Sequence, residues 1–211
     1  MIVSWNEFEY NKFVEAIVQN DLIVVSDLIS INGKLDSFNN SSKYTSPLLV
    51  ALDWREPDYM LPLENVELVQ RLIHAGTDIN ARNATCDTPL IIAAWTKKLH
   101  TVVLLCEAGA DVNASNEDGY TSLIAAAQYG YSEIVARLLS QGANVNTQTQ
   151  QGLTALIMAA VNGHTKTVRI LLEHDADINV VTNLGDTALS LAREARHYTI
   201  GRLLLPPATR L

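Results

Sequence analysis

The sequence predicts an all-α protein made of stacked helix-turn-helix units. A leucine recurs every 33 residues, at Leu90, Leu123, Leu156 and Leu189. A threonine stands two residues before each of these leucines, and a pair of alanines follows the first three. A fixed period of this length is typical of solenoid proteins, in which each unit packs only on its neighbours.

Within one period the pattern predicts a tight turn, a short helix, a second turn, a longer helix and a loop. Val135, Leu138 and Leu139 form the i, i+3, i+4 stripe of a helix buried on one side. Gly142 and its equivalents stand where a left-handed residue ends the second helix, and Asp175 takes this place in the fifth unit. An asparagine follows an apolar residue in each loop, which predicts a buried turn held by its side chain. These asparagines are Asn80, Asn113, Asn146 and Asn179.

The units fill the chain in order, and we expect residues 1–211 to form a single domain. A capping unit at 13–38, preceded by a lead-in at 1–12, lacks the glycine-threonine turn. The unit at 43–81 carries an insertion at 55–63, whose two prolines exclude a simple helix extension. Regular repeats follow at 82–114, 115–147 and 148–180. A C-terminal capping unit occupies 181–207, where Arg193 replaces a packing alanine and is expected to face solvent.

Composition narrows the possible partners. The chain has 211 residues, 48% of them hydrophobic, and a formal net charge of -8. The acidity is spread along the chain, so we expect no nucleic-acid partner, because binding phosphates requires clustered Lys and Arg. A basic protein surface is the favoured partner. The two cysteines, Cys86 and Cys106, occupy different structural positions and are expected to stay unpaired, which suits a reducing compartment.

The sequence also suggests a location. The N-terminal residues include early acids and no apolar run, so we expect no secretory signal peptide. No stretch approaches the ~20 apolar residues of a membrane span, so we expect no membrane partner. A cytoplasmic monomer is therefore the simplest expectation. Secretion without a cleaved leader remains an alternative.

The repeated motifs resemble those of the ankyrin repeat. Gly119-Tyr-Thr-Ser-Leu123 is similar to the family's Gly-x-Thr-Pro-Leu-His turn, and Gly109-Ala-Asp-Val-Asn-Ala114 to its loop. Gly163-His164 resembles its turn between the helices. The resemblance covers about residues 13–205, although the motif histidine is replaced by Leu49, Ile91, Ile124, Ile157 and Ser190. It implies a solenoid with projecting β-hairpin loops, a concave binding groove, a protein partner and no catalysis.

The sequence shows no catalytic constellation, and we expect no enzyme activity, cofactor or metal. The five histidines form no metal-spaced set with cysteine or acid. His164 and His197 fall at the turn between helices, where a structural role is expected. Phosphate-binding loops and nucleophile elbows are missing.

Aromatic residues at partner-facing repeat positions are the strongest functional signal. Trp54, Trp95, Tyr120 and Tyr129 are predicted to anchor a partner, because Trp and Tyr often dominate binding energy. Packing of these rings on their neighbours is an open alternative. Gln128 and the acidic residues Asp53, Asp87, Glu117 and Asp118 complete the predicted surface and favour a partner with a basic segment. A bacterial effector, or an immunity-type inhibitor of a basic protein, is the alternative function.

Overall fold

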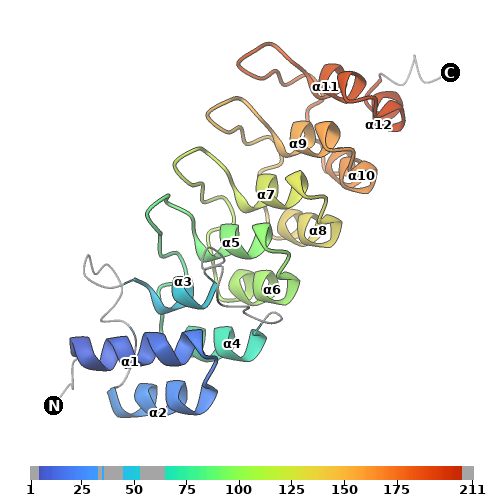
Figure 1. The fold of residues 1–211 in the computed structure, drawn as a ribbon. Helices are drawn as coiled ribbons and strands as arrows, with labels where there is room; N and C mark the ends of the chain where they lie inside the picture. The colour runs from blue at the N-terminus through green and yellow to red at the C-terminus, as the bar shows by residue number, and fades with distance from the viewer. Residues whose placement is uncertain (1–4, 33–34, 36–44, 53–64, 206–211) are drawn as a thin grey trace. The chain divides into compact units, whose positions relative to one another are not determined.

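The computed structural model describes residues 5–32, 35, 45–52 and 65–205. These residues form two compact units, within residues 1–111 and 112–211, which we call the N-terminal and C-terminal units. In each unit the helices follow one another in pairs (Figure 1). The part of the chain that is described contains only isolated β-bridges besides its helices, so the all-α prediction is confirmed. The insertion predicted at 55–63 lies outside the described residues.

The described residues of the N-terminal unit stack as three helix pairs. Its helices are α1 (Glu7–Val18), α2 (Leu22–Asn32), α3 (Pro47–Leu52), α4 (Val66–His74), α5 (Pro89–Trp95) and α6 (Leu99–Glu107). The first helices pack in order, α1 on α3 and α3 on α5, while α4 packs on α6. Phe13, Leu48, Leu72 and Leu90 are fully buried along this stack and form its core.

Helix α1 begins at Glu7, within the segment 1–12 that was expected to be a lead-in. The reason is local, because Asn6 and Glu9 form a capping box. The Asn6 side chain accepts a hydrogen bond from the Glu9 amide at 2.9 Å, and the Glu9 carboxylate accepts one from the Asn6 amide at 3.1 Å. This exchange satisfies two backbone donors that a helix start leaves unpaired. Trp5 then packs on Phe13, with ring centroids 4.9 Å apart.

The C-terminal unit repeats the same arrangement at the strict period. Its helices are α7 (Ser122–Gln128), α8 (Ser132–Ser140), α9 (Ala155–Val161), α10 (Thr165–Glu173), α11 (Ala188–Glu194) and α12 (Tyr198–Leu203). Helix α9 packs between α7 and α11, and α10 packs between α8 and α12. Two parallel layers of helices result, one of first helices and one of second helices.

The recurring threonines start the first helices. In each case the threonine hydroxyl accepts a hydrogen bond from an amide three residues later, at 3.4 Å for Thr121, 3.2 Å for Thr154 and 3.1 Å for Thr187. A side-chain cap of this kind stabilises a helix by about 1 kcal/mol. In the last repeat Ser190 also accepts from the Thr187 amide at 2.9 Å and so completes a capping box.

Small side chains between the first helices allow close packing. The paired alanines Ala126, Ala127, Ala159 and Ala160 are all fully buried. In the second layer, Leu138, Val168 and Leu171 are fully buried as well. Arg193, which replaces an alanine in the last repeat, is exposed as the sequence predicts.

Two loops of the C-terminal unit carry the antiparallel bridge of a β-hairpin, as expected. Antiparallel bridges join Ser115 to Thr121 and Val181 to Thr187. Neighbouring loops are joined by backbone hydrogen bonds, from Gln150 N to Asp118 O at 2.9 Å and from Asn183 N to Gln151 O at 3.0 Å. The loops of the C-terminal unit therefore form a continuous hydrogen-bonded row.

The recurring asparagines connect repeats, which differs from the expected buried turn. Asn113 and Asn146 are exposed, and each accepts a hydrogen bond from the next repeat, from Asn144 N at 2.8 Å and Asp177 N at 2.9 Å. In the N-terminal unit Asn80 accepts from Asp111 N at 2.9 Å in the same way. The bond spans 31 residues in all three cases, so asparagine recurs here because it ties one loop to the next.

The asparagine connections can be tested with a matched pair of variants. Asn146→Ala should lower the free energy of unfolding by about 1 kcal/mol, because the bond to Asp177 N is lost. Asn179→Ala should have a smaller effect, since its side chain donates to Asp177 within its own turn. Urea unfolding of both variants measures the difference. Equal losses would contradict a role between repeats.

Two non-glycine residues at predicted turn positions adopt the left-handed backbone. Asp175, where the three preceding repeats have glycine, has a φ of 62°, and Cys86 at the loop turn has a φ of 61°. Both cysteines are free, as expected, and Cys106 is buried.

Candidate functional site

The predicted partner-binding residues fall into three groups. Trp54 and Asp53 lie outside the described residues. Trp95 and Asp87 belong to the N-terminal unit, whereas Tyr120, Tyr129, Gln128, Glu117 and Asp118 belong to the C-terminal unit. Each unit is therefore considered separately.

In the N-terminal unit, Trp95 is the last residue of α5 and is half-buried. Helix α5 begins at Pro89 behind its Thr88 cap, so Trp95 stands two turns further on, just after the buried Ala93 and Ala94. The indole thus keeps accessible surface at the end of a first helix.

Asp87 corrects the expectation of an acidic rim at this loop, because its side chain is only 1% exposed. The carboxylate accepts hydrogen bonds from Thr85 Oγ1 at 2.6 Å and from Asn83 Nδ2 at 3.1 Å. The Asn83 side-chain oxygen in turn accepts from the amides of Thr85 and Asp87. Asp87 therefore stabilises the hairpin tip through internal hydrogen bonds, and its buried carboxylate is not accessible to a partner.

In the C-terminal unit, Tyr129 is the most exposed of the predicted aromatic residues that the structure describes. It stands at the C-terminal end of α7 with 50% of its surface exposed. Its ring stacks on Tyr131, with centroids 5.7 Å apart and an interplanar angle of 18°. The stack packs one face of the exposed ring against Tyr131, next to Gln128, which is half-buried.

Tyr131 was not recognised as a site residue from the sequence. It precedes α8, at the repeat position that His164 occupies before α10 and His197 before α12. Those histidines have the structural role that was expected. His164 Nε2 lies 2.9 Å from Gln128 O, and His197 Nε2 lies 3.1 Å from Val161 O. Aligning the repeats at this position would have marked Tyr131 as the aromatic exception.

The loop that carries Tyr120 is acidic and rigid. Glu117 and Asp118 are exposed at its tip. Asn116 Oδ1 accepts hydrogen bonds from the backbone amides of Asp118 at 3.1 Å and Tyr120 at 2.9 Å. Gln150 of the next loop donates its side-chain amide to Glu117 O. The carboxylate groups are therefore presented on a backbone that is fixed from both sides.

Burial and neighbouring groups raise the pKa values of two tyrosines at this site. Burial, followed by the charge of Asp118, raises the pKa of Tyr120 above its ordinary 10.0. Burial, followed by the neighbouring Tyr129, raises the pKa of Tyr131. Both phenols are neutral hydrogen-bonding groups at physiological pH.

The described residues offer no cluster of three or more His, Cys, Asp or Glu side chains that could hold a metal ion. Across the same parts of the chain, every helix is too short or too polar to span a bilayer. What the geometry does provide is rigid, repeated loops and exposed aromatic groups, which are features of a binding surface.

The fold defines a repeat protein of stacked helix pairs with hairpin loops. The family described as ankyrin repeats (3 copies) matches residues 58–149 and 141–210. The chain belongs to the ankyrin repeat family, whose members generally serve as protein–protein interaction modules. No curated protein matches the chain.

Proposed function

We propose that this protein is a non-enzymatic interaction module that binds a partner protein through the ends of its first helices and its hairpin tips. The observation that carries the proposal is the exposed Tyr129 ring stacked on Tyr131. Trp95, Trp54 and Tyr120 are proposed as further anchors.

The stack supports binding for an energetic reason. A flexible side chain loses about 0.5–1.5 kcal/mol of conformational freedom when a complex forms. Tyr129 is already restrained by Tyr131, so less of this entropy remains to be lost on binding. A half-exposed tyrosine also combines apolar area with a hydroxyl group, which suits the centre of an interface.

The acidic hairpin tip favours a partner with a basic segment. The carboxylates of Glu117 and Asp118 form no ion pair with another described residue. A lysine or arginine of the partner could approach these carboxylates and also the face of Tyr120. An effector or an immunity-type inhibitor would use the same surface, and the identity of the basic partner distinguishes these two functions.

The central test compares two tyrosine variants of the C-terminal unit. Tyr129→Ala should weaken binding of a partner captured from the native cell about tenfold or more, because it removes an interface anchor. Tyr198→Ala is the matched control, since Tyr198 is 69% exposed and lies at the start of α12. Affinity purification with mass spectrometry identifies the partner, and calorimetry measures both variants.

Two outcomes would contradict the proposal. Equal affinities of the Tyr129→Ala variant and the unchanged protein, with intact helical content, would exclude Tyr129 as an anchor. An association rate that is insensitive to salt, and to Glu117→Gln with Asp118→Asn, would exclude a basic partner, because steering between opposite charges is screened by salt.

A further inference from the structure

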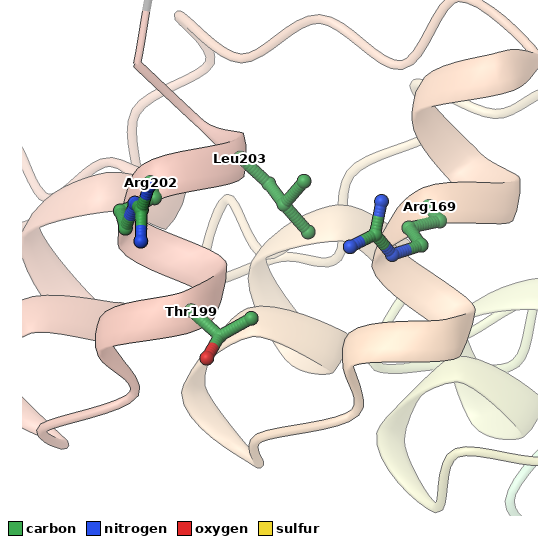
Figure 2. A pocket seen from close by; sticks show the side chains of 4 residues that line it. All are labelled: Arg169, Thr199, Arg202 and Leu203. Atoms are coloured by element: carbon green, nitrogen blue, oxygen red, sulfur yellow. The ribbon is translucent and has the colours of Figure 1, made fainter. Parts of the chain in front are cut away.

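A second feature of the C-terminal unit lies on its layer of second helices. A hollow of about 370 Å³ is lined by Arg169 from α10 and by Thr199, Arg202 and Leu203 from α12. Figure 2 shows the Arg169 guanidinium group extending from its helix toward Leu203 and Thr199. The hollow is separate from the hairpin tips and from Tyr129, which ends a first helix.

The repeat places the two arginines in register. Arg169 and Arg202 are 33 residues apart and so occupy the same position in consecutive second helices. Packed helices lie roughly 8–10 Å apart, a separation that two arginine side chains can bridge through one shared ion. Ala136 stands at this position in the preceding repeat, so the cationic pair is particular to the last two repeats.

Neither guanidinium group is neutralised by a described residue. Arg169 and Arg202 are exposed and form no hydrogen bond or ion pair within the described ranges. Glu173, one turn after Arg169 on α10, does not pair with it. The formal charge of the whole chain is -8, so two arginines at one hollow without an ion pair to any described residue form a local exception.

We propose that this hollow binds a phosphate monoester. Two guanidinium groups match the charge of about -1.5 to -2 that a phosphate monoester carries at pH 7, and arginine binds phosphate oxygens in a bidentate manner. Thr199 lines the hollow beside Arg169, and Leu203 supplies an apolar wall for the group that carries the phosphate. Since a water molecule occupies about 30 Å³ of liquid, the hollow has room for both.

The experiment follows the arginine side-chain N–H signals by NMR while phenyl phosphate is added to the full chain at pH 7.5. The Nε–H signals of Arg169 and Arg202 should shift with saturation in the range of about 1 mM. Inorganic phosphate should bind more weakly because it does not contact Leu203, and acetate should bind more weakly still. At pH 5 the affinity for phenyl phosphate should fall, because its second pKa is about 6.

Variants of the lining residues identify which side chains bind the phosphate monoester. Arg169→Ala and Arg202→Ala should each weaken binding about tenfold, and Arg169→Lys should weaken it because the bidentate geometry is lost. Lys166→Ala is the matched control, since this exposed lysine lies one turn before Arg169 and does not line the hollow. Its effect should be about twofold or less, as expected for a screened surface charge. Circular dichroism checks that the helices remain intact.

A comparison of two ligands distinguishes a phosphorylated protein segment from a small molecule as the natural ligand. Tighter binding of a short phosphoserine peptide than of phenyl phosphate supports the site and identifies a phosphorylated protein segment as the ligand. Tighter binding of phenyl phosphate supports the site and identifies a small molecule. No saturable shift with either monoester, an equal response to acetate, or equal losses in the Lys166→Ala and Arg169→Ala variants would overturn the proposal.

Discussion

Replacing Leu171 by alanine should lower the free energy of unfolding by about 3 kcal/mol, because buried leucine-to-alanine changes typically cost about 2–5 kcal/mol. Leu171 is 0% exposed and belongs to α10, which packs on α8, α9 and α12. The cavity would therefore open in the middle of the second-helix layer. With a urea dependence of about 1–3 kcal/mol per molar, the unfolding midpoint should fall by about 1 M or more.

The control for this experiment is Leu184→Ala. Leu184 is 90% exposed on the last hairpin loop, so the same chemical change removes almost no buried surface. Its effect should lie within about 0.5 kcal/mol of zero. If Leu171→Ala were as mild as this control, the second helices would not form a packed layer.

The repeat architecture could be predicted because its causes recur in the sequence. Thr121, Thr154 and Thr187 each cap the start of a first helix, so the same residue type marks a helix start at three positions in the sequence. The buried alanines and leucines follow from the same logic, since each repeat packs on copies of itself. Even the left-handed Asp175 was predictable, because glycine occupies its place in the three preceding repeats.

The candidate site was harder to predict because it depends on departures from the repeat. Tyr131 replaces a histidine whose role is structural in the next two repeats, and only the structure shows that it supports Tyr129. For Asp87, the sequence predicted a surface role that the structure does not support. It was assigned to the surface by its charge and position, yet Asn83 and Thr85 enclose its carboxylate.

The recurring asparagines show a third limit of prediction from sequence, which concerns hydrogen-bond partners. Their recurrence predicted a structural role, but sequence alone assigned the bond to a turn within one repeat. In the structure Asn113 and Asn146 bond to the following repeat, 31 residues further along the chain. Local reasoning could not find this partner, because the distance between loops is set by how the helices stack.

Close contact between loops also makes Gly152→Ala a severe substitution. Gly152 has a φ of 79°, and an alanine in this left-handed region costs about 1–2 kcal/mol. An added Cβ would also lie 3.0 Å from Asn183 N, Asn183 Oδ1 and Thr182 Cα of the next loop. We expect a total loss of about 2–5 kcal/mol in the free energy of unfolding, since crowding in packed structure adds about 1–3 kcal/mol to the backbone cost.

The neighbouring loop cannot relieve this contact easily, because hydrogen bonds fix it in place. Asn183 N donates to Gln151 O at 3.0 Å, and Asn183 Nδ2 donates to Gln150 O at 2.8 Å. Gly185 is the matched control, since it occupies the same repeat position with a φ of 84° and a Cβ there would meet nothing within 4 Å. Gly185→Ala should therefore show only the backbone term of about 1–2 kcal/mol. The difference between the two variants in urea unfolding measures the contact between loops, and equal losses would mean that the row of loops is not tightly packed.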